Sequence, residues 1–584
     1  MRLTVKLRIV PLLAVLFSVA PLLASRQPVH ARHAVVVSVH ELASRAGVEI
    51  LQAGGNAVDA AVATGFALAV VHPQAGNLGG GGFMLIRLAD GQVHFLDYRE
   101  KAPAAATANM YLDASGNVVP DASLVGYKAI GVPGSVAGMT YAEKKFGKLG
   151  LERVMAPAIA LARDGFPLAW EDARDLHDKD LAKFPVSHRI FQRDGNYYQQ
   201  GEVFRQPELA RTLKRIASSP DDFYHGSMAR EIAASVQQGA GLITADDLAN
   251  YEVKEREPVR GTYRGYEVIS APPPSSGGAA LLEILNILEG YDLAKAGDRS
   301  AQSIHLTVEA FRRAFFDRAE FMGDPDFSKI PVAQLIDKKY AAAWRESINP
   351  SHASVSQDLK RPAIFSQLET YAAAHPQPFT VRESEDTTHY SVVDGDGNAV
   401  SVTTTLNDHF GSRVTAGNLG FLLNDEMDDF SSKPGVPNYF HLIQGQANAI
   451  GPGKRPLSAM TPTMVLDNGK LFLVLGSPGG PRIITTVANI LLGVVDYGMN
   501  IQESINAPRF HHQWLPDLIG VEQWFSPDTI KALEQMGHKV EIGETLGSTW
   551  DPYWSDGECI AIDQKTGERL GGSDTRRNGK AVGY

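Results

Sequence analysis

A regular hairpin pattern begins at Thr387 and constrains the fold of this 584-residue chain more than any other segment. Residues 387–394 alternate polar with apolar side chains, as in a half-buried β-strand. The turn Gly395-Asp396-Gly397-Asn398 follows, and residues 399–407 continue as a returning strand. Counting back from this turn places Thr387 opposite Leu406, so that Thr405 and Asn407 lie beside Thr387.

The residues before the hairpin indicate a site of chain cleavage. The acidic stretch Glu383-Ser384-Glu385-Asp386 precedes Thr387. Apolar side chains in residues 352–378 follow neither a helical nor a strand period, so we interpret this segment as a loose, exposed tail. A threonine freed there could use its own amine, with a pKa near 8, to activate its hydroxyl. The position of Thr387 at the start of the strand pattern fits equally a surface threonine that begins an ordinary hairpin.

The first residues are typical of a secretory signal peptide. Residues 1–8 are basic, residues 9–23 are apolar, and Val29-His30-Ala31 fits cleavage after a small residue. The apolar stretch is shorter than the roughly 20 residues of a membrane-spanning helix, which argues against a retained anchor. We therefore expect residues 1–31 to be removed, and the mature chain to begin near Arg32 in the periplasm or in the medium.

Composition excludes several classes of function. A net charge of -11 and a pI near 5.9 argue against nucleic-acid binding, which needs a basic face. The single Cys559 excludes an internal disulfide framework and favours a small buried side chain. His511-His512 lacks the companion ligands of a zinc site, and the residues after Gly79–Gly82 lack the Lys-Ser or Lys-Thr of a phosphate loop. We expect no metal and no cofactor.

The remaining patterns predict sheets covered by helices, an α/β arrangement. Helices are expected within His40–His72 with a break at residues 54–56, through most of residues 135–256, and at 279–289, 303–318 and 483–497. Strands are expected at 83–88, 93–98, 263–270, 463–467 and 471–475.

A series of motifs along almost the entire mature chain resembles the gamma-glutamyltranspeptidase family of N-terminal nucleophile hydrolases. These motifs, in order, are Gly54-Gly55-Asn56-Ala57-Val58-Asp59-Ala60, Asp97-Tyr98-Arg99-Glu100, Asp386-Thr387-Thr388-His389-Tyr390-Ser391-Val392-Val393-Asp394, Gly397-Asn398-Ala399-Val400, Thr405-Leu406-Asn407, Asn424-Asp425-Glu426-Met427-Asp428-Asp429-Phe430, Lys454-Arg455-Pro456-Leu457-Ser458, Gly476-Ser477-Pro478-Gly479-Gly480 and Asn506-Ala507-Pro508-Arg509-Phe510-His511-His512.

The resemblance implies a four-layer αββα sandwich and a self-cleaving zymogen. Autocleavage at Asp386-Thr387 would leave a large subunit, residues 32–386, and a small subunit, residues 387–584, as a heterodimer. Thr387 would then attack the γ-carbonyl of glutathione or another γ-glutamyl compound. Water, an amino acid or a peptide would accept the γ-glutamyl group from the resulting ester, without a cofactor.

The resemblance also implies a site for both charged ends of the γ-glutamyl group. Arg99 matches the arginine that binds the α-carboxylate, and a guanidinium can make a two-pronged contact that lysine cannot. Asp429 matches the acid that binds the α-ammonium, with Glu426 and Asn407 beside it. Ser458 matches one of the serines at the substrate carboxylate.

The catalytic machinery is implied in the same way. Thr405 matches the threonine that hydrogen-bonds the hydroxyl of the nucleophile. Gly479 and Gly480 match the oxyanion glycines, whose backbone amides stabilise negative charge on the carbonyl oxygen.

The chain departs from the family pattern near this site. Ala459 stands where many bacterial members have a second serine, and Glu426 where some relatives have glutamine. Residues 434–445 resemble the lid loop of some members, with Phe440 where a gating tyrosine is found and Tyr439 adjacent.

Two other functions remain open from the sequence. Related N-terminal nucleophile hydrolases remove glutaryl side chains from β-lactams, substrates that lack the α-ammonium, and the Asp429 and Glu426 carboxylates favour γ-glutamyl over glutaryl. Alternatively, the chain is an uncleaved export protein that binds γ-glutamyl peptides without catalysis.

Overall fold

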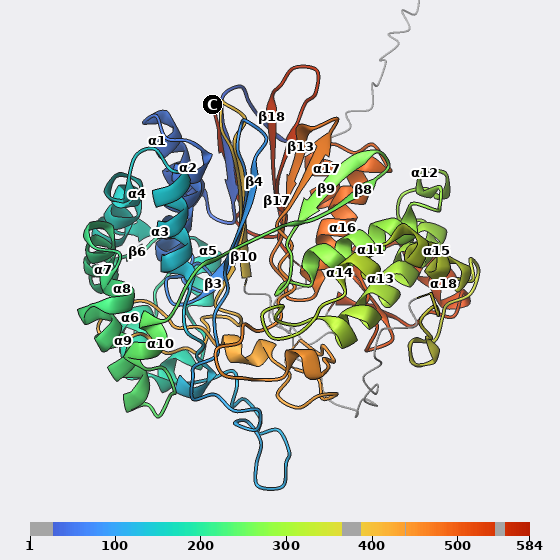
Figure 1. Ribbon diagram of the computed structural model, residues 1–584. Helices are drawn as coiled ribbons and strands as arrows, with labels where there is room; N and C mark the ends of the chain where they lie inside the picture. The colour runs from blue at the N-terminus through green and yellow to red at the C-terminus, as the bar shows by residue number, and fades with distance from the viewer. Residues whose placement is uncertain (1–26, 365–386, 439, 544–554) are drawn as a thin grey trace, which may run out of the picture.

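The computed structural model describes residues 27–364, 387–438, 440–543 and 555–584, which form a four-layer sandwich (Figure 1). Two seven-stranded sheets pack face to face, and a layer of helices covers the outer surface of each. The alternation of side chains along the strands produces these layers. Val36 packs toward one helical layer, whereas its neighbours Val35 and Val37 lie in the apolar core between the sheets. The expected αββα fold is confirmed.

One sheet carries the hairpin that begins at Thr387. Its pairs of neighbouring strands are antiparallel, in the order β19 (Lys580–Gly583), β2 (Val35–Ser38), β10 (Thr387–Val393), β11 (Ala399–Thr405), β3 (Gly81–Arg87), β4 (Val93–Tyr98) and β7 (Lys254–Arg256). Strand β10 is therefore an inner strand with a neighbour on both sides.

The second sheet is also antiparallel. Its order is β1 (Val29–Ala31), β18 (Arg569–Ser573), β17 (Glu558–Ile562), β13 (Lys470–Leu475), β12 (Thr463–Asp467), β9 (Tyr266–Ser270) and β8 (Val259–Tyr263). The expectation of a single strand over residues 263–270 was wrong. Arg264 and Gly265 both adopt positive φ, at 51° and 90°, and turn the chain back between β8 and β9.

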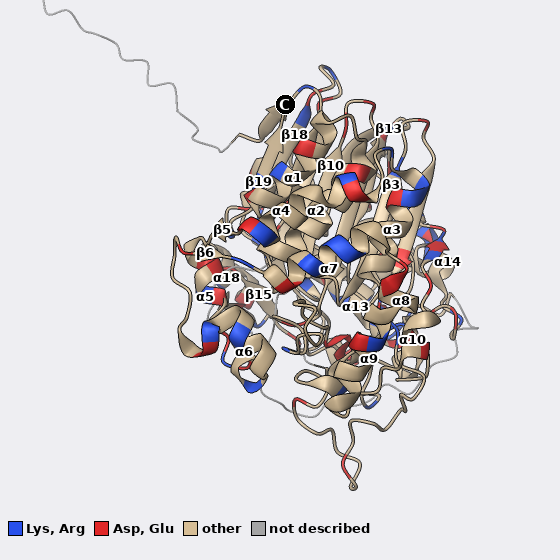
Figure 2. Ribbon diagram, turned by 90° about the vertical axis from the view of Figure 1, so that its left-hand side faces the viewer, with Lys and Arg blue, Asp and Glu red and all other residues tan. Residues whose placement is uncertain are grey.

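Helices α1 to α10 cover the sheet that contains β10. They are α1 (Glu41–Gln52), α2 (Ala57–Val71), α3 (Ser135–Phe146), α4 (Leu151–Asp164), α5 (Trp170–Asp175), α6 (Pro185–Gln192), α7 (Pro207–Ser218), α8 (Asp222–His225), α9 (Ser227–Gln238) and α10 (Ala245–Ala249). Every residue of α2 is buried, and Asn56 caps its first turn. The outer helices α7 and α9 instead carry acidic and basic side chains side by side (Figure 2).

The helices that follow lie on the other side of the sandwich (Figure 1). They are α11 (Gly277–Leu288), α12 (Leu293–Ala296), α13 (Ala301–Phe321), α14 (Val332–Leu335), α15 (Lys338–Glu346), α16 (Arg482–Val495), α17 (Ile501–Asn506) and α18 (Pro527–Gln535). Two smaller sheets complete the fold, one of β14 (Phe510–His511), β15 (Ile519–Val521) and β16 (Val540–Ile542), the other of β5 (Phe166–Pro167) and β6 (Val203–Phe204).

The register of the β10–β11 hairpin differs by one residue from the sequence count. Thr387 pairs with Thr405, not with Leu406. The turn is shorter than expected because Asp394 N–H donates to the Asn398 carbonyl at 3.0 Å, which leaves three residues in the loop. Gly397 has a φ of 91°, the left-handed conformation that such a loop requires near its end. Thr405 consequently faces Thr387 directly.

The segment before the hairpin is more ordered than its sequence suggested, as far as the structure describes it. Within residues 352–364, Ser356 is buried and Arg361 forms an ion pair with Asp317 of α13 at 2.5 Å. The guanidinium of Arg361 also lies over the ring of Phe316. The expectation of a loose tail was wrong for this part, and residues 365–378 lie outside the described residues.

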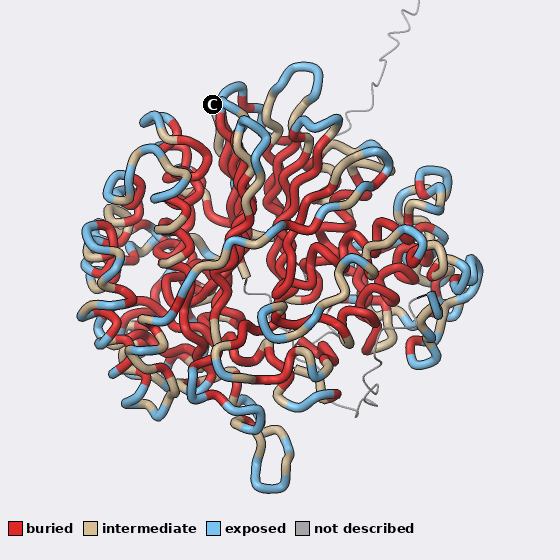
Figure 3. The backbone as a smooth tube through the Cα atoms, viewed as in Figure 1, coloured by how far each residue is buried: buried red, intermediate tan, exposed pale blue. Residues whose placement is uncertain are grey.

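The parts of the chain before and after Thr387 are interleaved. Each seven-stranded sheet contains strands from both parts, and the buried backbone runs through both sheets and the helices against them (Figure 3). A break at Thr387 would therefore leave two fragments that share one core. Within the described residues, no helix combines the length and the apolar character needed to cross a membrane.

Candidate active site

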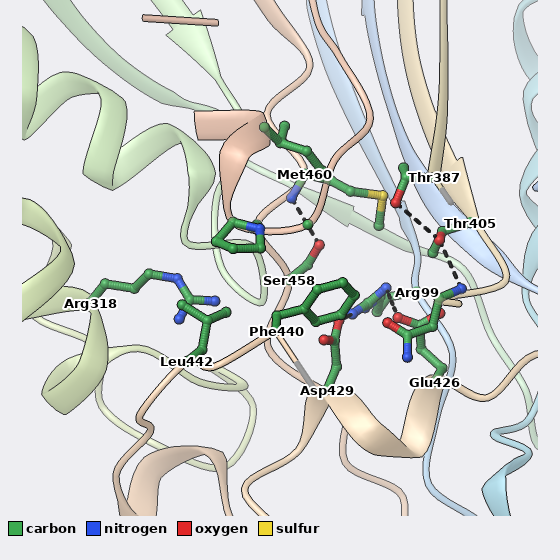
Figure 4. Close-up of a pocket in the computed structure, with 15 residues that line it drawn as sticks. Arg99, Arg318, Thr387, Thr405, Glu426, Asp429, Phe440, Leu442, Ser458 and Met460 are labelled. Carbon is green, nitrogen blue, oxygen red and sulfur yellow. Dashed lines mark hydrogen bonds and ion pairs between the residues drawn. The ribbon is translucent and has the colours of Figure 1, made fainter. Parts of the chain in front are cut away.

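A pocket opens at the end of β10 and β11 and brings together side chains from distant parts of the chain (Figure 4). Every predicted site residue except Gly479 lines it. The lining residues are Arg99, Arg318, Thr387, Thr405, Asn407, Glu426, Asp429, Phe440, Leu442, Ser458, Ala459, Met460, Gly480, Pro481 and Ile483. Gly479 immediately precedes the lining residue Gly480.

Thr387 and Thr405 form the hydroxyl pair at one end of the pocket. Their Oγ1 atoms lie 3.2 Å apart, and Thr405 Oγ1 also accepts the backbone N–H of Asn407 at 2.8 Å. Asn407 has a φ of 83°, a left-handed conformation that asparagine tolerates better than most residues. This bend ends β11 and turns Asn407 into the pocket.

Arg99, which directly follows β4, lies at the centre of an acidic group. Its Nη1 is 2.5 Å from Glu426 Oε1 and 3.6 Å from Glu100 Oε2, and its Nη2 donates to Asp429. Arg99, Glu100 and Glu426 are almost completely buried, whereas the Asp429 side chain is 14% exposed. The two groups expected to bind opposite charges of a substrate are therefore paired with each other.

Burial controls the charge of this group. Burial alone would lower the pKa of Arg99, but Glu426, Asp429 and Glu100 outweigh it and raise that pKa. Burial raises the pKa of Glu100 to about 7, against the attraction of Arg99. Burial also raises the pKa of Glu426, again opposed by Arg99. Arg99 is therefore always charged, while the acids behind it gain protons readily.

Asn424 holds the acidic residues in place. The sequence did not suggest this positioning role. Its Nδ2 donates to the carbonyls of Gly79 and Gly131, at 2.7 and 2.9 Å, and its Oδ1 accepts the N–H of Glu426 at 3.0 Å. These bonds fix the short helix η5 (Glu426–Asp429) against the first half of the chain. Asp429 is thereby presented to Arg99 across a sequence distance of 330 residues.

The glycine pair stands at the start of α16. Gly479 and Gly480 have φ values of 119° and 52°, so both adopt conformations that favour glycine. A side chain at Gly480 would also meet the ring of Phe440 at 2.7 Å. The helix that begins at Arg482 points the positive end of its dipole toward this turn, which suits a developing oxyanion.

His389 belongs to β10, two residues after Thr387, and its ring packs against the loop that carries Gly476 and Gly479. Its Nδ1 is 2.9 Å from Thr403 Oγ1, its Nε2 is 3.1 Å from Ser391 Oγ, and a side chain at Gly476 would clash with its ring. Burial lowers the pKa of His389 to about 3, so the ring is neutral. His389 therefore spaces β10 from the loop that carries Gly479.

Ser458 forms the other wall together with Phe440 and Leu442, two residues of the segment that resembles a lid loop. Ser458 Oγ accepts the N–H of Met460 at 3.0 Å, which leaves its proton for another acceptor. Phe440 is buried and lines the pocket, and its carbonyl accepts Gln513 Nε2 at 3.1 Å. Tyr439, the other candidate for the gating residue, lies outside the described residues.

Arg318 is the charged lining residue that sequence reasoning missed. It belongs to α13, which was expected only as a helix over residues 303–318. The sequence signal was the number of charged and histidine side chains along α13, and the structure shows that six of them are buried, namely His305, Glu309, Arg312, Arg313, Asp317 and Arg318. Such side chains are rarely buried without partners or a function.

His511 and His512 have protein partners at both ring nitrogens. His511 contacts Thr485 and Gln513, each at 2.9 Å. His512 accepts the N–H of Trp514 at 3.1 Å and lies 3.3 Å from Asp517. These contacts give both rings a structural role in holding the segment that binds the Phe440 carbonyl.

Comparison with known proteins places the chain among enzymes with this architecture. A sequence model of the family described as Gamma-glutamyltranspeptidase matches residues 43–584. A glutathione hydrolase proenzyme from Pseudomonas sp. (strain A14) is 53% identical over 525 residues, covering 88% of each chain. One from Escherichia coli (strain K12) is 49% identical over 554 residues, covering 94% of this chain and 91% of the relative. The crystal structure of cephalosporin acylase from Bacillus halodurans is similar with a TM-score of 0.80 and 28% identity, over 97% of this chain and 98% of that one.

Proposed function

The chain belongs to the gamma-glutamyltranspeptidase family, and on that premise we propose that it is a glutathione hydrolase and gamma-glutamyltransferase with Thr387 as nucleophile. Thr387 Oγ1 attacks the γ-carbonyl carbon of glutathione, and the bond to the nitrogen of cysteinylglycine breaks as that nitrogen gains a proton. The γ-glutamyl ester on Thr387 then passes to water or to the amine of an amino acid or peptide.

The observation that carries this proposal is the pairing of Arg99 with Asp429 and Glu426. A buried charge that loses its partner is strongly unfavourable. A γ-glutamyl group brings an α-carboxylate for Arg99 and an α-ammonium for Asp429, so both keep a partner when their mutual contact opens. A ligand with a carboxylate alone leaves Asp429 unpaired.

The same threonine is proposed to mature the enzyme. In the precursor, Thr387 Oγ1 attacks the carbonyl carbon of Asp386, and the peptide bond becomes an ester. The Thr387 amine is released in this step, and water then hydrolyses the ester, which gives the Asp386 carboxylate and restores the Thr387 hydroxyl. The freed amine has a pKa near 8 and takes the hydroxyl proton in later turnovers.

The neighbours of Thr387 have defined roles in this scheme. The hydroxyl of Thr405 lies 3.2 Å from that of Thr387 and orients it. The backbone amides of Gly479 and Gly480 receive the negative charge that develops on the carbonyl oxygen. Ser458 donates its free proton to the α-carboxylate, and Asn407 contributes to the pocket beside the α-ammonium.

We further propose an exported heterodimer of a large subunit that ends at Asp386 and a small subunit that begins at Thr387. The interleaved strands support a stable pair after cleavage. Val29–Ala31 form strand β1, which pairs with β18, so cleavage of a signal peptide directly after Ala31 would remove this strand. Removal before residue 29 would preserve it.

N-terminal sequencing of the purified protein, together with a glutathione assay with and without a dipeptide acceptor, tests the proposal. We expect a Thr387 terminus, release of cysteinylglycine, and a new γ-glutamyl peptide when the acceptor is present. A protein that remains uncleaved and inactive would support the binding function instead.

The second candidate, an acylase, is suggested by the similarity to the cephalosporin acylase structure. Rates on a γ-glutamyl amide and on the matching glutaryl amide separate the two functions. The Asp429 contact predicts a higher kcat/KM for the γ-glutamyl compound, and the opposite order would favour the acylase.

A further inference from the structure

Arg318 lies in the pocket on the side away from the nucleophile. In Figure 4 it extends from α13 across the pocket from Thr387 and Thr405, with Ser458 and Phe440 between. The residue is only 2% exposed. Its guanidinium is therefore a buried charge at the pocket wall, contributed by the part of the chain before the proposed cleavage point.

The guanidinium of Arg318 has few partners. Its Nε donates to Ser276 Oγ at 2.8 Å, whereas its Nη1 is buried and has no hydrogen-bond partner among the residues that the structure describes. Burial lowers the pKa of Arg318 to about 10, and Asp429 opposes this shift. Arg318 thus remains charged at neutral pH, and no carboxylate of the described residues is within ion-pair distance of it.

The described residues that line the pocket include one other arginine, Arg99, and its charge is already paired with acidic side chains. Arg99 is shared by Glu100, Glu426 and Asp429, so the group carries more acidic than basic side chains. A substrate carboxylate that approaches Arg99 meets these acids. Arg318 is the other cation among the described lining residues, and it supplies positive charge without an acidic partner of its own.

Ser276 connects Arg318 to the backbone of Ser458 through hydrogen bonds. Its Oγ accepts Arg318 Nε and donates to the Ser458 carbonyl at 2.7 Å. Ser276 precedes α11, at the end of the turn Pro272–Ser275, and is completely buried. The guanidinium is therefore fixed relative to Ser458, whose hydroxyl has a proton to donate, and the two form a preorganised set of donors.

We propose that Arg318 is a second carboxylate-binding residue of the substrate pocket, acting from the opposite side to Arg99. The inference rests on the proposed function. The carboxylate has two sources in glutathione, the α-carboxylate of the γ-glutamyl group and the C-terminal carboxylate of the leaving peptide. In either case the unpaired Nη1 gains an acceptor, and the charged hydrogen bond strengthens substrate binding.

The test compares Arg318→Gln and Arg318→Lys with the natural enzyme on two substrates. Glutathione carries both carboxylates, whereas γ-glutamyl-p-nitroanilide carries only the α-carboxylate. We expect KM to rise about tenfold or more in Arg318→Gln, with kcat changing much less, and lysine to recover part of the loss. A rise on both substrates assigns the α-carboxylate, and a rise on glutathione alone assigns the leaving peptide.

Two controls separate binding from folding. Arg313→Gln removes a buried arginine of the same helix that pairs with Glu309, at 2.6 Å, and should lower the Tm without raising KM. Ser276→Ala removes the acceptor of Arg318 Nε but keeps its charge, and should raise KM less than Arg318→Gln does. If Arg318→Gln does not mature, Arg318→Lys and Ser276→Ala provide the measurement.

An unchanged KM in every matured variant of Arg318 and Ser276 would overturn the inference. So would a fall in kcat alone, which would indicate a structural effect on the nucleophile. These results differ from failure of the proposed function, because in that case the natural enzyme itself has no activity on either substrate.

Discussion

Thr387 and Thr405 face each other across the first pair of the β10–β11 hairpin, with their hydroxyl oxygens 3.2 Å apart. Because Thr405 also accepts the N–H of Asn407, one hydroxyl links Thr387 to the bend that ends β11. The orientation of the Thr387 hydroxyl therefore depends on the hairpin register.

Replacing Thr405 with valine keeps the shape of the side chain and removes this link. We expect slower cleavage at Asp386-Thr387 and a kcat about 10- to 100-fold lower, because a hydrogen bond to the reacting hydroxyl contributes about 1–3 kcal/mol. Gel analysis over time and steady-state kinetics measure both effects. Thr405→Ser keeps the hydroxyl and should retain most of the activity, and a Thr405→Val enzyme that matures normally would contradict the proposed role.

Asp429→Asn tests the ammonium contact. Loss of a charge-assisted bond in a nearly buried site is expected to raise the KM for γ-glutamyl-p-nitroanilide about 30-fold or more. The kcat/KM for the glutaryl analogue, which has no ammonium, should fall much less. An equal loss on both substrates would show that Asp429 acts through Arg99 alone.

Glu100 predicts a pH dependence of stability. Its pKa is raised from 4.5 to about 7 by burial, so the folded protein binds its proton more tightly than the unfolded chain. Stability from this group is present below about pH 4.5 and is lost as the pH rises toward 7. Glu100→Gln mimics the protonated form.

The matured Glu100→Gln enzyme should have nearly the Tm of the natural enzyme at about pH 5 and a higher one at about pH 8. Thermal unfolding at both pH values measures this difference. A variant that is less stable than the natural enzyme at the higher pH would show that ionised Glu100 contributes favourable contacts to Arg99.

Gly480→Ala tests the oxyanion turn. The positive φ disfavours alanine, and its Cβ would meet Phe440 at 2.7 Å, so the backbone amides must shift. We expect kcat to fall about 100-fold or more, as when an oxyanion donor is lost. Gly498→Ala is the matched control, since its φ of 67° is also positive but its Cβ meets nothing within 4 Å, and it should leave kcat unchanged.

Ala459→Ser tests a departure from the family pattern. Ala459 lines the pocket beside Ser458, where a second hydroxyl could donate to the substrate carboxylate. We expect the KM for γ-glutamyl-p-nitroanilide to decrease about 3- to 10-fold, the effect of one hydrogen bond to a charged group. An increase in KM would show that the extra oxygen does not reach the ligand.

Local patterns in the sequence determined the layers and most of the elements. The alternation after Thr387, the apolar run of α2 and the capping residue Asn56 act over a few residues, so their consequences are readable without the fold. These patterns gave the wrong hairpin register at the turn with Gly397, and they missed the turn at Arg264-Gly265 that separates β8 from β9. Motif resemblance supplied the candidate site and the contact of Thr405 with Thr387, but not the pairing of Arg99 with Asp429 and Glu426.

Only the tertiary structure decided which charges meet. Arg99 follows β4, Asp429 lies in η5, and Arg318 comes from α13 on the far side of the sandwich, yet the packing of two sheets brings all three to one pocket. Long-range packing sets burial, and burial together with neighbouring charges sets the ionisation of Glu100. The same packing leaves Arg318 without an ion pair among the described residues. The sequence determined that Thr387 opens a strand, and the fold determined that Thr405 faces it.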